Sequence, residues 1–581
     1  MIGTRDLVRF AAWALVPLAA GAGIVAWLAL AASADLGRGR ERLLAGDVAG
    51  AEAAFDRARR WPATTDAARS GRRAADARAG RAVGEAVPLV RLDALAPEAL
   101  VLSALAEGRL DAAAAIADLA RRAGHPLGAL YAAAVAFERG DEAGARARAR
   151  ESRVPLDSRG LGSKLRQALE ARDTGAVTLL FDRRGDLAAT AGRDGRLRAT
   201  SEAAPFLAGV LERLGRAPDR PAVRLAIDLG LSRLALDALG STRGSIVLVE
   251  PRTGSVLAAV SDARTAASER AAAFEQRRKP ASIAKLLTAA AAYRAGLDSD
   301  AEIKRMTCTG VGRYGGQALW CAFPAGPLEG LDHALAVSCN LAFANLGVRI
   351  GAERLLEEHR LWGFDAGGDA WLGAAGRVHT RPRTPLEVAD LSIGLEMADV
   401  TPLHAALLAA VVADDGHLHE PRLLLGPCGG LGLTDEPRPP HAGRAATSPA
   451  IARRLRKAMQ AVAASGTGAG LAPASFPAGM KTGTAAAPGL GYHVNYIGLG
   501  PLPEPTVAFC VRVTHERSNP AVTRAARNVT RRLLELLAAD RMGLAREGQS
   551  GAGGSVQRPS RTWTTGPDRN GTVDHHRVSD Q

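Results

Sequence analysis

Two strand-rich segments lie far apart in this chain of 581 residues. Residues 223–262 contain the apolar runs IVLVE and SVLAAVS around a proline-containing turn, and residues 491–513 again predict two strands joined by such a turn. A mainly helical segment from Ser282 to about Gly368 separates them. From this order of strands, helices and strands we expect the distant strands to share one half-buried antiparallel sheet. The sequence therefore predicts an α+β domain over residues 222–540.

The N-terminal segment predicts a membrane anchor. No charged residue lies between Phe10 and Ala34, and about 20 apolar residues suffice to cross a bilayer. Arginines at positions 5 and 9 place residues 1–9 in the cytoplasm by the positive-inside rule. The alternative is a cleaved signal peptide ending at Ala32-Ser33-Ala34, for which the apolar stretch is long. Both interpretations export the rest of the chain.

The chain is basic, with 74 Lys and Arg against 60 Asp and Glu and a net charge of +14. Such a charge suits nucleic acid, an anionic membrane surface or an anionic wall polymer. Arginine is spread along the whole sequence, and no recognisable nucleic-acid-binding module accompanies it. We therefore attribute the charge to an arginine-rich composition and expect no nucleic-acid partner.

Residues 35–172 predict a helical domain with a weak internal repeat. The segments AGDVAGAEAAFDRA, EGRLDAAAAIADLA and RGDEAGARARARES begin at Ala45, Glu107 and Arg139. Their spacing is near the period of paired-helix repeats of the tetratricopeptide kind, although the aromatic signature positions are missing. An irregular helical domain is the alternative. A true repeat would offer a concave face to a protein partner.

Three further segments complete the organisation. Residues 173–221 contain apolar alternation and an Asp-Gly turn, which predict short strands in a small pedestal or linker. A closing helix is expected over about 519–540. Residues 541–581 are rich in Gly, Ser, Arg and Asp without apolar rhythm, which predicts a disordered tail.

Three short polar motifs follow one another along the chain. Ser282-Ile-Ala-Lys285 opens an alanine-rich helical run, so that its hydroxyl and amine share one helix face. Ser338-Cys339-Asn340 comes next, and Lys481-Thr482-Gly483-Thr484 lies just before the strand YHVNYIGLG. S-x-x-K alone is common, and a helix start with a solvated lysine is the plain alternative. The ordered triple is the pattern of serine penicillin-binding proteins and class A β-lactamases.

These residue types meet the needs of serine acyl transfer. Ser282 becomes a nucleophile only when a base takes its proton, and Lys285 can do this once burial or a nearby positive charge lowers its pKa. Lys481 is the candidate for that charge. We expect Ser338 to relay protons to the leaving amine. Asn340 would orient a substrate amide and hold Lys285 by a hydrogen bond.

The third motif predicts a substrate-binding strand. Thr482 and Thr484 stand at i and i+2, so both hydroxyls lie on one face and can hold a terminal carboxylate together with Lys481. Gly483 lets a substrate backbone approach an edge strand. The backbone N–H groups of Ser282 and Thr484 are the expected oxyanion hole.

The surroundings of the motifs resemble the transpeptidase domain of penicillin-binding proteins over about Val223–Asp540, including SIGLEMADVTPLHAALLAAVVADDG and GMKTGTA. LFDRRGDLAAT resembles the D-R-N-G-x-x-L-A signature near the pedestal of class B members, with Arg184 replacing the asparagine and most of the usual pedestal missing. The resemblance implies the penicillin-binding/β-lactamase-like fold in a single-pass, membrane-anchored, extracytoplasmic enzyme. It implies a serine D,D-transpeptidase that cross-links peptidoglycan stem peptides ending in D-Ala-D-Ala and is acylated by β-lactams, without metal or cofactor.

Two related activities are excluded by the sequence. Class A β-lactamases carry E-x-x-L-N between the second and third motifs, but no asparagine lies between Gly347 and Lys481. The glycosyltransferase motif E-D-x-x-F-x-x-H is missing from residues 35–221. Three alternatives stay open: a D,D-carboxypeptidase that uses water as acceptor, a β-lactam sensor, or a non-catalytic scaffold whose helical domain recruits wall-synthesis proteins.

The cysteines have no metal-ligand spacing. Cys308 and Cys321 bracket a Gly-rich loop and are a candidate disulfide in an oxidising compartment, with the free thiols as the alternative. We expect Cys339, Cys428 and Cys510 to act as small buried hydrophobic residues. His493 and Asn495, next to the last strands, are expected at the surface rather than on the substrate.

Overall fold

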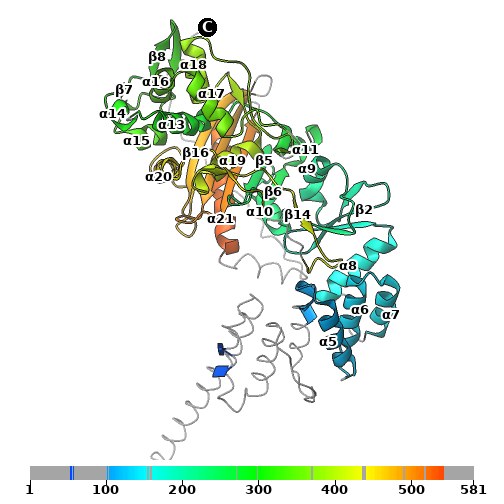
Figure 1. Ribbon diagram of the computed structural model, residues 1–581. Helices are drawn as coiled ribbons and strands as arrows, with labels where there is room; N and C mark the ends of the chain where they lie inside the picture. The colour runs from blue at the N-terminus through cyan, green and yellow to red at the C-terminus, as the bar shows by residue number, and fades with distance from the viewer. Residues whose placement is uncertain are drawn as a thin grey trace, which may run out of the picture.

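The computed structural model describes residues 53–54, 56–57 and 101–541, apart from positions 103, 123, 153–155, 157–159, 270, 298, 368–370, 435–439, 488–490 and 516–518 (Figure 1). The predicted anchor at 10–34 and the predicted tail beyond residue 541 lie outside these residues. Within the described part of the chain, no helix combines the length and the apolar character that crossing a bilayer requires.

The N-terminal region is helical, as predicted. Its described helices are α5 (Leu110–Arg122), α6 (Gly128–Glu138), α7 (Glu142–Glu151) and α8 (Leu161–Asp173). The apolar side of α6 is fully buried at Leu130, Tyr131 and Phe137, and these side chains form the centre of a core that is separate from the main one. Gly108 precedes α5 and Gly140 follows α6, so two glycines of the weak repeat lie at helix ends.

A five-stranded sheet follows, in the order β14-β4-β1-β2-β3. Its strands are β1 (Thr178–Phe181), β2 (Leu187–Ala191), β3 (Leu197–Ala199), β4 (Ala222–Leu225) and β14 (Leu424–Pro427). Strand β4 pairs in parallel with β1 and antiparallel with β14, which comes from far along the chain. The sheet thus takes strands from both sides of the predicted boundary between residues 221 and 222.

The helical region and this sheet are joined by buried contacts. Leu179, Phe181 and Leu431 pack in the same core as α6 and α8. The Glu138 carboxylate, at the end of α6, accepts hydrogen bonds from the backbone N–H groups of Gly430 at 2.8 Å and Leu431 at 2.9 Å. Burial raises the pKa of this carboxyl group, while the two N–H donors act in the opposite direction.

The larger domain contains the predicted second sheet, in the order β16-β17-β18-β5-β6, with every neighbouring pair antiparallel. The strands are β5 (Gly244–Val249), β6 (Val256–Ser261), β16 (Gly479–Ala487), β17 (Gly491–Gly500) and β18 (Val507–His515). Both distant strand segments therefore lie in one sheet, because β18 pairs with β5. This confirms the α+β prediction and leaves β16 at one edge.

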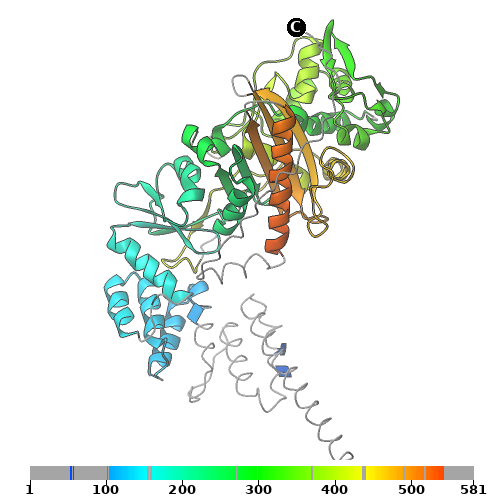
Figure 2. The same cartoon turned by 180° about the vertical axis from the view of Figure 1, so that it is seen from behind.

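Helices cover both faces of the second sheet. Helix α19 (Pro402–Ala413) lies on the face seen in Figure 1, and α21 (Asn519–Arg541) lies on the opposite face, seen in Figure 2 beside α10 (Leu229–Leu239). All residues of α19 from Pro402 to Val412 are buried, as expected of a helix apolar on every side. Smaller elements pack around them: α9 (Ala204–Leu214), α11 (Ala263–Ser268), α12 (Ala272–Glu275), β11 (Arg377–Val378), β12 (Ala398–Asp399), β13 (His417–Leu418) and β15 (Arg444–Ala445).

A helical lobe lies beyond the β16 edge, at the other end of the molecule from α5–α8 (Figure 1). It contains the 3₁₀ helix η2 (Ala281–Ala284), α13 (Lys285–Arg294), α14 (Ser299–Lys304), α15 (Leu331–Ala336), α16 (Asn340–Ile350), α17 (Ala352–Leu361), α18 (Pro385–Ile393) and α20 (Pro449–Ala464). The sequence prediction of a mainly helical segment missed four short strands inside it, β7 (Thr307–Cys308), β8 (Val311–Tyr314), β9 (Gln317–Trp320) and β10 (Gly326–Pro327).

Candidate active site

Ser282 lies in η2, which continues directly into α13 at Lys285. A 3₁₀ helix has three residues per turn, so the serine and the lysine lie one above the other on the same side. The residue before the serine, Ala281, has a φ of 52°, a left-handed conformation that costs a non-glycine residue energy. Its N–H group donates to the Gly394 carbonyl at 2.6 Å, which fixes the entry into η2.

The β16 edge passes directly beside this serine. A Cβ atom built on Gly483 would lie 2.7 Å from the Pro280 oxygen and 3.2 Å from the Ser282 backbone nitrogen. Only glycine allows so close an approach between the strand and the start of η2. The structure thus brings the first and third motifs together at the unpaired edge of the sheet.

Lys285 is the centre of a hydrogen-bonded cluster. Its Nζ donates to the Ser338 carbonyl at 2.6 Å, to Asn340 Oδ1 at 2.7 Å and to Ser338 Oγ at 3.3 Å. The ring centre of Phe343 lies 5.7 Å from the same nitrogen. As an ammonium group the lysine donates all three bonds, and as a neutral amine it keeps a lone pair free to accept a proton.

Burial makes the Lys285 ammonium group lose its proton more easily. The side chain is 0% exposed, and desolvation lowers its pKa from 10.5 to about 7. The thiols of three nearby cysteines act in the opposite direction. The predicted depression of this pKa therefore comes from burial, and the charge of Lys481 is not needed to explain it.

Ser338 connects the two lysines. Lys481 Nζ donates to Ser338 Oγ at 3.0 Å and to the Thr482 carbonyl at 2.9 Å. Burial, followed by repulsion from Lys285, holds the pKa of Lys481 well below its usual range. Ser338 itself has a φ of 56°, a second left-handed non-glycine residue at this site. The hydroxyl of Ser338 thus lies between two buried amines of lowered pKa.

The remaining motif residues occupy the same neighbourhood. Asn340 begins α16, and its side-chain amide donates to the Trp320 carbonyl at 2.6 Å, which turns Oδ1 toward Lys285. Thr482 is 9% exposed, and Thr484 is partly exposed two residues further along β16. Register places Thr482 opposite Tyr496 on β17. The carboxylate-binding role of the two threonines stays a prediction.

The structure adds residues that the sequence analysis missed. Thr467 shares a hydrogen bond of 2.8 Å with the Thr482 hydroxyl, and Arg527 of α21 donates to the Thr467 carbonyl at 2.9 Å. Trp320, whose carbonyl holds Asn340, is 66% exposed. The motifs alone could not find these residues, because Thr467 approaches the site from a loop before β16, Trp320 from the β8–β9 hairpin and Arg527 from α21.

The expectation of surface positions for His493 and Asn495 is wrong. Both are 0% exposed, because helices cover the two faces of the sheet. His493 Nε2 pairs with the Lys279 carbonyl at 2.9 Å, and Arg512 Nε donates to Asn495 Oδ1 at 2.7 Å. Burial lowers the pKa of His493 to about 3, so this imidazole is neutral. It supports the backbone that leads into η2.

The pedestal signature joins the turn between β1 and β2 to the start of α10. Asp182, 1% exposed, accepts from the backbone N–H groups of Arg184 and Asp186 at 2.9 Å each and from Leu229 at 3.1 Å. Arg184 Nε donates to the buried Asp228 carboxylate at 2.5 Å. The arginine that replaces the signature asparagine therefore holds the start of α10.

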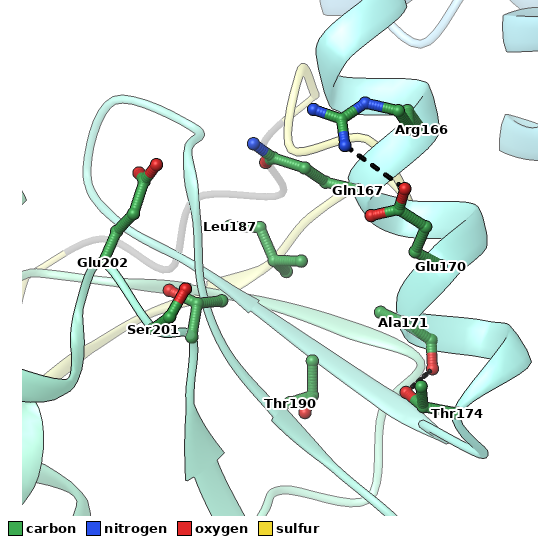
Figure 3. Close-up of a pocket in the computed structure, with 10 residues that line it drawn as sticks. Arg166, Gln167, Glu170, Ala171, Thr174, Leu187, Thr190, Ser201 and Glu202 are labelled. Atoms are coloured by element: carbon green, nitrogen blue, oxygen red, sulfur yellow. Dashed lines mark hydrogen bonds and ion pairs between the residues drawn. The ribbon is translucent and has the colours of Figure 1, made fainter. Parts of the chain in front are cut away.

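A cavity of about 370 Å³ lies elsewhere, between α8 and the first sheet (Figure 3). Its lining is mainly polar and includes Gln167, Glu170, Thr190, Ser201 and Glu202. No residue of the three motifs lines it, so it is separate from the candidate acyl-transfer site.

Comparison with known proteins decides the family. The model of the penicillin binding protein transpeptidase domain matches residues 244–535. The chain belongs to the penicillin-binding protein transpeptidase family. Its relatives include the peptidoglycan D,D-transpeptidase PbpA of Mycolicibacterium smegmatis, 30% identical over 344 residues, which cover 52% of this chain and 68% of that protein. Stage V sporulation protein D of Bacillus subtilis is 27% identical over 41% of this chain and 38% of its own length.

Solved structures agree with the transpeptidase fold. A D,D-transpeptidase domain of a peptidoglycan glycosyltransferase from Eggerthella lenta superposes with a TM-score of 0.54 at 20% identity, covering 64% of this chain and 99% of that one. PBPA from Mycobacterium tuberculosis superposes with a TM-score of 0.51 at 24% identity, covering 62% and 99%.

Proposed function

We propose that this chain is a penicillin-binding peptidoglycan D,D-transpeptidase that works through a serine acyl-enzyme. The single observation that carries the proposal is the chain of hydrogen bonds from Lys285 through Ser338 to Lys481, beside a serine one helical turn from the first lysine. Two buried amines of lowered pKa next to a hydroxyl can accept and return protons at neutral pH, as general-base catalysis requires.

The first half-reaction transfers the donor acyl group to the enzyme. Lys285 takes the proton of the Ser282 hydroxyl, whose oxygen attacks the carbonyl carbon of the penultimate D-Ala. The backbone N–H groups of Ser282 and Thr484 hold the developing oxyanion. The C–N bond then breaks, and the leaving D-Ala amine receives a proton through the Ser338 hydroxyl, which Lys481 supports.

The second half-reaction releases the product. An amine of a neighbouring stem peptide attacks the Ser282 ester, and the proton path runs in reverse to restore the hydroxyl. Thr482, Thr484 and Lys481 bind the terminal carboxylate of the donor, and Gly483 admits its backbone beside the strand. In a β-lactam the same attack opens the ring and leaves a long-lived acyl-enzyme.

The direct test uses labelled penicillin and the Ser282→Ala variant. Wild-type protein should form a covalent adduct, and mass spectrometry should place it on the peptide that contains Ser282. The variant should form none while its thermal unfolding stays within a few degrees of wild type. Equal labelling of the two proteins would overturn the proposal.

Products distinguish the related activities. Incubation with glycan strands that bear pentapeptides should yield cross-linked dimers and free D-Ala. Tetrapeptide without dimers would identify a D,D-carboxypeptidase, in which water is the acceptor. Penicillin labelling without any release of D-Ala would identify a β-lactam sensor, and absence of both would identify a non-catalytic scaffold.

We further propose the cellular arrangement. Residues 10–34 anchor the chain in the membrane, with residues 1–9 in the cytoplasm and the domain at 222–540 outside. Residues 35–172 form a tetratricopeptide-like unit that binds wall-synthesis proteins, which the paired arrangement of α5–α8 supports. Added external protease should degrade the catalytic domain in spheroplasts. Full protection from that protease would contradict this topology.

A further inference from the structure

Three cysteine side chains meet beside the acyl-transfer cluster. They are Cys308 at the end of β7, Cys321 directly after β9 and Cys339 directly before α16. Their sulfur atoms all lie within 4.8 Å of one another. Cys321 Sγ is the shared neighbour, 3.6 Å from Cys308 Sγ and 3.8 Å from Cys339 Sγ. All three are free thiols in the structure.

The thiol cluster contacts a residue that holds Lys285. The Asn340 backbone N–H donates to Cys321 Sγ at 3.2 Å, and the Asn340 side-chain amide donates to the carbonyl of Trp320, the residue before that cysteine. Asn340 Oδ1 in turn accepts from Lys285 Nζ at 2.7 Å. Cys321 is therefore connected to the candidate general base, Lys285, through one residue, Asn340.

The charge of the thiol cluster provides a second connection to Lys285. The groups around Lys285 Nζ are the Lys481 amine on β16, the Ser338 hydroxyl, the Asn340 amide, the Phe343 ring and the three thiols. A hydrogen bond from the Cys339 thiol, helped by backbone N–H groups at the start of α16, lowers the pKa of Cys321 to about 5. Loss of the Cys321 proton would place a negative charge in this cluster, and a negative charge on these thiols favours the protonated form of Lys285.

We propose that Cys321 and Cys308 form a disulfide in the extracytoplasmic space, and that this bond removes a negative charge beside the hydrogen bond that joins Asn340 to Lys285. Cys308 is the partner for two reasons. Its sulfur is nearer, and Cys339 Sγ already accepts the Ala342 N–H as the N-terminal cap of α16. The bond would also close the β8–β9 hairpin, where the Cys321 N–H donates to the Gly310 carbonyl at 2.8 Å.

The reaction needs an external disulfide as oxidant. The Cys321 thiolate attacks one sulfur of that oxidant, which forms a mixed disulfide and expels one thiolate. Cys308 then loses its proton, attacks the Cys321 sulfur and expels the second thiolate. Two cysteine thiols are oxidised, two electrons reduce the oxidant, and the sulfurs approach from 3.6 Å to about 2.05 Å by rotation of the half-buried Cys321 side chain.

Peptide mapping tests the bond independently of catalysis. The full chain in detergent is treated with glutathione disulfide or with dithiothreitol, alkylated, digested without reductant and analysed by mass spectrometry. We expect a peptide joining Cys308 to Cys321 after oxidation and its loss after reduction. A peptide joining Cys321 to Cys339, or no cross-linked peptide at all, would overturn the proposal.

The pH dependence of penicillin acylation tests the effect on Lys285, and this part rests on the proposed function. A lysine that loses a neighbouring negative charge acts as a base at lower pH, so the midpoint of the acid limb should fall by about one pH unit on oxidation. Cys321→Ser should show the low midpoint with or without reductant. The control Cys428→Ser should respond to reductant as wild type does.

Equal midpoints for oxidised and reduced wild-type protein would contradict the charge effect. Failure of the proposed function gives a different result, because penicillin would then label Ser282→Ala as well as wild type. The peptide map would still report the disulfide in that case.

Discussion

Acylation should depend on pH with a midpoint near 7 in the reduced protein, where the thiols are free as in the structure. Lys285 is 0% exposed, and burial lowers its pKa to about 7. Only the neutral amine accepts the serine proton, and its fraction is about 90% at pH 8, about 50% at pH 7 and about 10% at pH 6. An ordinary lysine would be neutral in only about 0.03% of molecules at pH 7.

The sign follows from the direction of the shift. Burial disfavours the ammonium form, so the group loses its proton at a lower pH than a solvated lysine, and activity is lost as pH falls through the lowered value. Second-order acylation rates with a fluorescent penicillin, measured by stopped flow from pH 5.5 to 9, should fall about tenfold between pH 8 and pH 6. Circular dichroism over the same range should stay constant.

Two results would refute this reasoning. A rate that does not change between pH 6 and pH 8 would show that no group of this pKa limits acylation. A midpoint above pH 9 would show that Lys285 titrates as a solvated lysine despite its burial. The Lys285→Arg variant is the matched control, because a guanidinium keeps its proton, and it should acylate at no pH in this range.

Two further substitutions test the packing around the site. Gly483→Ala places a methyl carbon 2.7 Å from a backbone carbonyl oxygen and should slow acylation at least about tenfold by pushing β16 away from η2. The control Ala486→Ser, at an exposed position of the same strand, should leave the rate of acylation unchanged. Equal rates for the two variants would contradict the close approach of β16 to η2. Arg294→Ala removes the 43%-exposed ion-pair partner of the buried Glu358 carboxylate, which keeps a hydrogen bond from Trp362 Nε1, and should lower the free energy of unfolding by about 1–3 kcal/mol in urea titrations. Arg360→Ala breaks only a solvent-exposed ion pair and should change it by less than about 1 kcal/mol; a similar loss in both variants would refute this ranking.

Local patterns determined most of the elements of this protein. The runs that predicted strands at residues 223–262 and 491–513 became β4–β6 and β17–β18, because short apolar runs bounded by turn residues are typical of buried strands. The three motifs could be found by their spacing and order. The family, the α+β fold and the transpeptidase activity could be predicted from these signals, because each strand run and each motif consists of residues that are close in sequence.

Only the tertiary structure decided which faces are buried and which segments meet. His493 and Asn495 alternate like surface residues, but α19 and α21 cover both faces of their sheet. No local pattern predicts that residues 424–427 complete the first sheet, or that Cys339 joins Cys308 and Cys321 beside Lys285. Periodicity reports how one element presents its side chains, whereas long-range contacts depend on the packing of elements that the chain brings together only on folding.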